Sequence, residues 1–114
     1  MAAANQSSEK WFKHLISVGV THVDFNAPWC KPCLAQEPII TALRKNYNDA
    51  AKITTLNIDE NRQIALNLGI QSIPTIIIYR DGREINRFIG LQTAETLHNA
   101  LRDVIHQSRV NRSR

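Results

Sequence analysis

The fold is decided by the segment Val23-Asp24-Phe25-Asn26-Ala27-Pro28-Trp29-Cys30-Lys31-Pro32-Cys33, which links a strand pattern to a helix pattern. Residues 20–25 predict a strand, and Ala27-Pro28-Trp29 interrupts it. The apolar spacing within residues 34–47 predicts a helix. The two cysteines of the chain, Cys30 and Cys33, are therefore expected where that helix begins.

On both sides of this segment the pattern alternates between helix and strand. Ser7 or Ser8 predicts the cap of a first helix that begins near Glu9 and ends at Gly19. Strands are expected over residues 53–58, 75–79 and 84–89, a short helix over 62–68, and a last helix capped by Thr93. The early alternation implies parallel strands joined by crossover helices, and Asp81-Gly82 predicts a hairpin that adds an antiparallel edge. The sequence thus predicts an α/β fold with a mixed sheet of about four strands and helices on both faces.

Length and composition fit one globular domain. The chain has 114 residues, of which 43% are hydrophobic, enough for a core. No run approaches the roughly 18 apolar residues of a membrane span, so no membrane partner is expected. The first eight residues lack the apolar stretch of a secretory signal, which makes the cytoplasm the expected location. We expect a flexible N-terminus over 1–8, the domain over 9–106, a flexible basic tail over 107–114, and a monomer.

Basic charge is concentrated at the C-terminal end. The formal net charge is +4, and residues 101–114 supply +3 of it through four arginines and one aspartate. Nucleic-acid binding needs basic residues clustered on an ordered surface. Charge in a frayed tail does not meet that need, so no nucleic-acid partner is predicted.

The cysteine pair carries the candidate chemistry. A helix N-terminus presents free N–H groups and a partial positive charge, which favour a thiolate, and Lys31 adds a cation beside Cys30. We therefore expect a lowered pKa for the Cys30 thiol, which makes it the attacking nucleophile. Cys33 lies one turn further into the helix, where it is expected to be more shielded and to resolve the mixed disulfide that Cys30 forms.

A zinc site and a cysteine hydrolase are the alternatives for this pair. Structural zinc needs four ligands, usually from two such pairs or from one pair and two histidines. The chain has no second pair, and its four histidines fall on different predicted elements: His14, His22, His98 and His106. Neither a metal site nor a histidine base is therefore predicted, and the histidines are expected at the surface or in packing.

The segment around the cysteines resembles the active-site signature of the thioredoxin family. Further matches follow in order and spacing, so that the similarity covers residues 9–106: Leu56-Asn57-Ile58-Asp59, Gly69-Ile70, Ile73-Pro74-Thr75, Asp81-Gly82 and Gly90. The resemblance implies a thioredoxin fold and a protein disulfide reductase that holds no cofactor besides its redox-active Cys30–Cys33 disulfide. It also implies disulfide-containing protein substrates, and electrons from NADPH through a thioredoxin reductase.

The resemblance further assigns roles to individual residues. Asp24 matches the family's buried acid, whose pKa is raised by desolvation and which takes the proton from Cys33. Pro74 matches the cis-proline beside the disulfide, and the backbone of Ile73 would pair with an extended substrate. The remaining expected substrate contacts lie on the flat surface around the cysteines: Trp29, Lys31, Pro32, Gly69 and Gly90.

Four features depart from the family pattern. Lys31 stands where thioredoxins usually carry Gly, Asn26 replaces a common Trp, and Thr55 replaces a Lys common near the buried acid. Residues 1–8 are too short and polar to supply the usual N-terminal strand, so the sheet is expected to have four strands.

Two other functions fit the same scaffold. One is a dedicated extracytoplasmic thiol–disulfide exchange protein, although Pro32 argues against a strong oxidant because the family's oxidising members tend to carry His there. The other is a binding module in which the cysteines are incidental.

Overall fold

The computed structural model describes residues 2–112, which form eight elements in the predicted order. The helices are α1 (Ala2–Ile16), α2 (Lys31–Tyr47), α3 (Arg62–Asn67) and α4 (Ala94–Arg112), and the strands are β1 (Val20–Asn26), β2 (Lys52–Asn57), β3 (Thr75–Arg80) and β4 (Arg83–Ile89). Thr93 caps α4 as predicted, because its Oγ1 accepts a hydrogen bond of 3.1 Å from the Thr96 N–H. No helix within residues 2–112 is long and apolar enough to cross a membrane.

The first helix begins earlier than the sequence indicated. It starts at Ala2 instead of near Glu9, so Ser7 and Ser8 lie inside the helix. The reason is the run Ala2-Ala3-Ala4, since alanine has the highest helix propensity. At the other end, α4 continues to Arg112, past the predicted end of the domain. The flexibility of residues 1–8 and 107–114 stays a prediction, and within these segments residues 1 and 113–114 lie outside the described residues.

The four strands form one mixed sheet in the order β2-β1-β3-β4, which confirms the predicted fold class. β1 pairs in parallel with β2 and antiparallel with β3, while β3 and β4 form the predicted hairpin. The expectation that the early strands all run parallel is therefore wrong for β3. The six residues of α3 rise only about 9 Å, whereas the six-residue β3 spans about 20 Å. Such a short helix does not return the chain to the far end of the sheet, so β3 starts where β1 and β2 stop.

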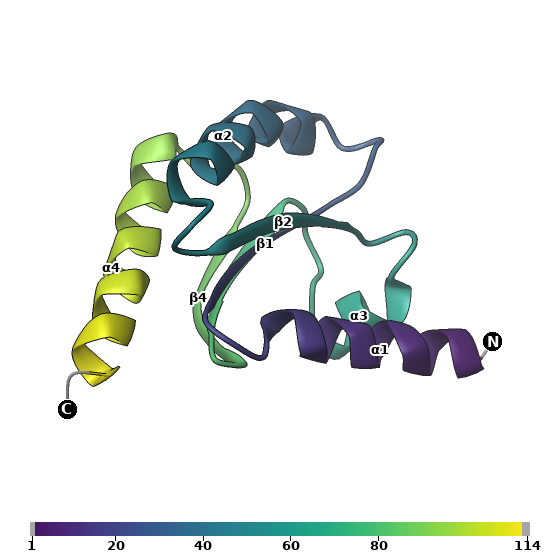
Figure 1. The fold of residues 1–114 in the computed structure, drawn as a ribbon. Coiled ribbons are helices and arrows are strands. Elements are labelled where there is room, and N and C mark those ends of the chain that lie inside the picture. Colours follow the sequence, from purple (N-terminus) through teal and green to yellow (C-terminus); the bar gives the residue numbers. More distant parts are fainter. Residues whose placement is uncertain (1, 113–114) are drawn as a thin grey trace.

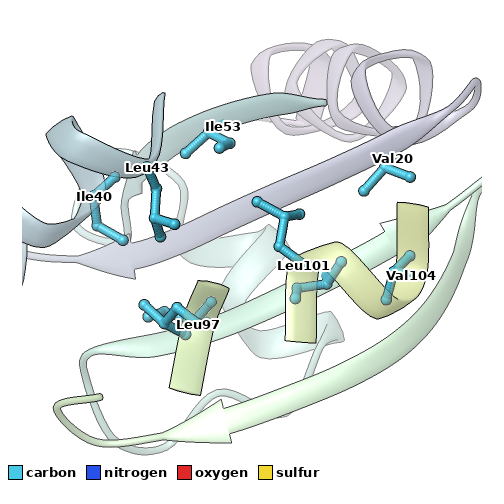
Figure 2. Close-up of a cluster of buried hydrophobic side chains, with 9 residues drawn as sticks. Val20, Ile40, Leu43, Ile53, Leu97, Leu101 and Val104 are labelled. Atoms are coloured by element: carbon cyan, nitrogen blue, oxygen red, sulfur yellow. The ribbon is translucent and has the colours of Figure 1, made fainter. Parts of the chain in front are cut away.

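Helices cover both faces of the sheet: α2 and α4 lie on one face, and α1 and α3 lie on the other (Figure 1). Successive strand residues point to opposite faces, so β1 places Val20 on the α2–α4 side and Val23 and Phe25 on the α1–α3 side. Figure 2 shows the first of these clusters, which joins both helices to the sheet through Val20, Ile40, Leu43, Ile53, Leu97, Leu101 and Val104. By the same alternation, His22 and Asp24 belong to the face under α2 and α4.

Candidate active site

Cys30 directly precedes the first residue of α2. It is the N-cap, with extended backbone angles of φ −92° and ψ 111°, and its Sγ accepts a hydrogen bond of 3.2 Å from the Cys33 N–H. The two residues between the cysteines, Lys31 and Pro32, form the first turn and are exposed. Proline is tolerated there because the first helical N–H groups have no partner within the helix. The predicted strand-to-helix position of the pair is therefore confirmed.

Cys30 and Cys33 form a disulfide. Their Cα atoms lie 5.2 Å apart, within the usual range for such a bond. Cys33 is slightly less exposed than Cys30, at 2% against 5%. Ala27 completes their buried cluster, and the half-buried Ile58 and Ile73 pack against it. Among the described residues no three His, Cys, Asp or Glu side chains gather as metal ligands.

The loop before β3 brings a backbone carbonyl to the disulfide. The Ile73–Pro74 peptide bond is cis, and the Ile73 carbonyl oxygen lies 3.6 Å from Cys30 Sγ. Gly90, at the end of β4, donates its N–H to the Pro74 carbonyl over 2.8 Å. Gly90 has a φ of +92°, a conformation that favours glycine. Ile73, Pro74 and Gly90 thus converge beside the cysteines, whereas Gly69 ends α3 with its N–H on the Leu66 carbonyl.

Trp29 lies at the surface next to Cys30. It is 68% exposed, and its indole Nε1 donates a hydrogen bond of 2.8 Å to Asp59 Oδ2. Asp59 had no predicted role. A signal for this contact was present in the order of the strands. Because β1 and β2 run parallel, the residues that follow them meet at one edge of the sheet. This hydrogen bond lets Asp59 orient the indole of the exposed Trp29 side chain.

Further apolar side chains are exposed around these segments. Leu34 follows Cys33 directly, and Ile89 and Leu91 flank Gly90, with exposures of 52%, 66% and 51%. Exposed apolar surface of this kind is typical of interaction sites. The segments that meet at the disulfide therefore present an apolar rim.

Asp24 is fully buried beneath α2, on the sheet face that it shares with Thr55 and Ile76 of the neighbouring strands. Neither of its carboxyl oxygens has a hydrogen-bond partner within the described residues. Burial, and secondarily the negative charge of Glu37, raise the pKa of Asp24 to about 7. A carboxyl group with this pKa exchanges its proton readily at neutral pH.

Glu37 had no predicted role either. It lies four residues after Cys33 on α2, which places both on one side of the helix. A surface hollow of about 300 Å³ is lined by Cys33, Glu37 and Thr55, among others. Because Thr55 pairs with Asp24 in the sheet, this hollow opens next to the buried acid. The helical spacing from Cys33 was the signal that pointed to Glu37.

Comparison with known proteins gives one consistent family. The thioredoxin family profile matches residues 3–103. The chain is 37% identical to thioredoxin 1 of Nostoc sp. over 103 residues, which covers 89% of this chain and 96% of that protein. It is 38% identical to the thioredoxin of Staphylococcus haemolyticus over 90 residues, covering 79% and 86% of the two chains.

Solved structures agree with this result. The thioredoxin Mala s 13 of Malassezia sympodialis superposes with a TM-score of 0.79 at 28% identity, covering 87% of this chain and 89% of that chain. A mutant thioredoxin from Halobacterium salinarum gives a TM-score of 0.76 at 27% identity, with 82% of each chain covered. The mixed four-stranded sheet flanked by helices is therefore a thioredoxin fold.

Proposed function

The chain belongs to the thioredoxin family and is a thiol–disulfide oxidoreductase that reduces protein disulfides, and we propose that Cys30 attacks the substrate while Cys33 resolves the product. The observation that carries this assignment is the hydrogen bond from the Cys33 N–H to Cys30 Sγ at the start of α2. A donor at the positive end of a helix stabilises a thiolate on Cys30 in the reduced protein. Cys33 is the less exposed of the two thiols, at 2% against 5%.

The proposed reaction moves two electrons from the pair to the substrate. The Cys30 thiolate attacks one sulfur of a substrate disulfide, forms a mixed disulfide, and releases the other substrate sulfur as a thiolate. The Cys33 thiolate then attacks Cys30 Sγ, which forms the Cys30–Cys33 disulfide and releases the second substrate thiolate. Both released thiolates take up protons, so the substrate ends as a dithiol.

Asp24 is proposed as the base for the second step. The Cys33 thiol must lose its proton before it attacks, and Asp24 lies on the sheet face directly beneath α2. Its pKa of about 7 lets the ionised carboxylate take the thiol proton and later return it to solvent. The hollow lined by Cys33 and Glu37 supplies the route to water.

The substrate is proposed to bind across the cysteines as an extended peptide. The half-buried Ile73 offers its backbone beside Cys30, since its carbonyl oxygen lies 3.6 Å from Cys30 Sγ. The proposed contacts around it are Trp29, Lys31, Pro32, Ile73, Pro74 and Gly90. The exposed apolar rim then covers the substrate on either side of its disulfide.

The proposal includes a monomer that receives its electrons from NADPH through a thioredoxin reductase. It also places the protein in the cytoplasm, the compartment that keeps thiols reduced and so supports this direction of electron flow. The alternative of a binding module with incidental cysteines is not favoured, because the family match extends through the cysteine pair.

Insulin reduction by dithiothreitol tests the proposal. The wild-type protein is expected to accelerate the reaction, and Cys30→Ser is expected to abolish the acceleration. Cys33→Ser should accumulate a mixed disulfide on Cys30 that excess dithiothreitol releases. Failure of the wild type to accelerate insulin reduction would refute the reductase function, and adducts that form on Cys33 in Cys30→Ser would reverse the two roles. Adding NADPH and a thioredoxin reductase in place of dithiothreitol tests the electron source.

A further inference from the structure

A buried glutamine joins the helix of the cysteine pair to the loop that follows β4. Gln36 is 0% exposed, although glutamine is a residue that proteins usually leave at the surface. Its Nε2 donates a hydrogen bond of 3.1 Å to the Gln92 carbonyl, and its Oε1 accepts one of 2.8 Å from the Gln92 N–H. One side-chain amide thus satisfies both backbone groups of a single loop residue.

The same loop is connected to the disulfide through two hydrogen bonds and one close contact. The Gln92 side chain donates to the Gly90 carbonyl over 3.2 Å, and the Gly90 N–H donates to the Pro74 carbonyl over 2.8 Å. The preceding carbonyl, that of Ile73, lies 3.6 Å from Cys30 Sγ. Starting from α2, the path passes through the loop and the cis-proline segment and returns to Cys30, the N-cap of α2.

We propose that Gln36 is a positioning residue that holds residues 90–92 in the shape that receives a protein substrate. The inference rests on the proposed function, because it uses the proposed substrate contact of Gly90. Leu91, which is 51% exposed, lies between the two anchored residues Gly90 and Gln92 and is therefore presented in a fixed place. A small disulfide that touches only Cys30 does not need this loop, whereas a polypeptide laid across the site does.

The geometry also indicates what happens when the amide is removed. Gln92 is half-buried, so its freed N–H and carbonyl groups can bond to water. The α4 end of the loop stays fixed by the Thr93 cap. Loss of the Gln36 amide should therefore loosen residues 90–92 without unfolding the domain.

The test replaces Gln36 with leucine, which has a similar volume and no hydrogen-bonding group. Gln63→Leu is the matched control, since Gln63 on α3 bonds only to the exposed Asn67 side chain among the described contacts. Steady-state reduction is measured with insulin and, separately, with hydroxyethyl disulfide. Amide hydrogen exchange at Gln92 reports directly on whether the Gln36 amide holds the Gln92 backbone. If Gln36→Leu does not fold, Gln36→Met is used with the same expectations, because an unbranched chain adapts to the site.

Gln36→Leu is expected to raise KM for insulin about tenfold, as two lost hydrogen bonds would. Its kcat for insulin and its rate with hydroxyethyl disulfide should stay within about twofold of the wild-type values, and Gln63→Leu should match the wild type. Gln92 exchange should accelerate about tenfold or more in Gln36→Leu alone.

Three results would overturn the inference. Equal losses with both disulfides would mean that Gln36 acts on the cysteine pair itself. Unchanged insulin kinetics, or unchanged exchange at Gln92, would mean that the loop is held or used differently. If the wild-type protein reduces neither disulfide, the proposed function fails; the exchange experiment still decides whether Gln36 holds the loop, but a role in substrate binding is then excluded.

Discussion

His22 and Asp24 lie two residues apart on β1 and point to the same face of the sheet, where both are fully buried. Within the described residues, neither ring nitrogen of His22 and neither carboxyl oxygen of Asp24 has a hydrogen-bond partner. Burial lowers the pKa of His22 to about 4, whereas burial and the charge of Glu37 raise the pKa of Asp24 to about 7. Both groups resist becoming charged, with opposite effects on how stability depends on pH.

Asp24→Asn is expected to stabilise the oxidised protein above pH 7. In the wild type, the folded state holds the Asp24 proton up to a higher pH than the unfolded chain does, so stability falls as the pH rises from 3.8 to about 7. Removing the charge should recover up to about 4 kcal/mol above pH 7, and the gain should shrink to nothing near pH 3.8. Urea unfolding across this range measures the difference. A variant with no pH-dependent gain would show that the carboxylate is not penalised by burial.

His22→Leu is expected to uncover the pH dependence that Asp24 gives to the free energy of unfolding. The unfolded chain binds a proton at His22 near pH 6.5 and the folded chain only near pH 4, so this histidine lowers stability by about 3 kcal/mol as the pH falls between those values. Over most of that interval the two contributions oppose each other in the wild type. Without His22, the free energy of unfolding should rise as the pH falls from about 7 to 4. The same urea series tests this, and a flat profile in His22→Leu would contradict it.

Glu37→Gln is expected to lower the pKa of Asp24. The negative charge of Glu37 is the second cause of the raised pKa of Asp24. Glu37 is exposed, whereas Asp24 is buried. The pH profile for release of a preformed mixed disulfide should therefore shift to lower pH. Glu95→Gln, in the first turn of α4, is a matched control without this effect. An Asp24 titration, followed by carboxyl NMR, that does not move would exclude Glu37 as its neighbour.

Asp59→Ala is expected to release the Trp29 indole. The hydrogen bond is exposed, so the free energy of unfolding should change by no more than about 0.5 kcal/mol. Reduction of insulin should slow by about twofold to fivefold, because a mobile indole must be ordered again on binding. Asp59→Asn keeps an acceptor oxygen and should behave like the wild type. Fluorescence anisotropy in a Trp11→Phe background reports the mobility of Trp29 alone. Equal anisotropy with Asp59, Asp59→Ala and Asp59→Asn would count against the hydrogen bond between Trp29 and Asp59.

Leu101→Ala is expected to destabilise the domain without changing its chemistry. Leu101 is 0% exposed and joins α4 to both α2 and the sheet (Figure 2). The cavity left by its side chain should reduce the free energy of unfolding by about 2–5 kcal/mol. Leu66→Ala, at a position that is 71% exposed, should have little effect. Urea unfolding measures both, and the reductase rate per folded molecule should match the wild type.

Much of this architecture is visible in the sequence because local patterns set it. Strand β1 and helix α2 follow from the apolar spacing on either side of the break at Ala27-Pro28-Trp29. The burial of Asp24 followed from the resemblance, and its position on β1 explains that burial. The direction of β3 did not follow from local patterns, because it depends on whether a six-residue α3 reaches back across the sheet.

The connections between distant segments were equally hidden from the sequence. Gln36 and Gln92 are 56 residues apart, and Trp29 and Asp59 are 30 apart. A polar residue inside a helix pattern predicts a surface position, and only the approach of the loop to α2 makes Gln36 a buried partner. Such contacts depend on the packing of whole elements, which pattern and propensity do not specify.

The place of β2 at the edge of the sheet affects the behaviour of the protein at high concentration. Within residues 2–112 no strand pairs with its outer side, so part of its backbone is available to template intermolecular strand pairing. Lys52 begins this strand and donates to the Leu15 carbonyl, which places a cation at the edge. Charged residues of this kind act as gatekeepers against fibrillar aggregation. Lys52 therefore protects this edge against aggregation from the opposite end of β2 to the redox chemistry.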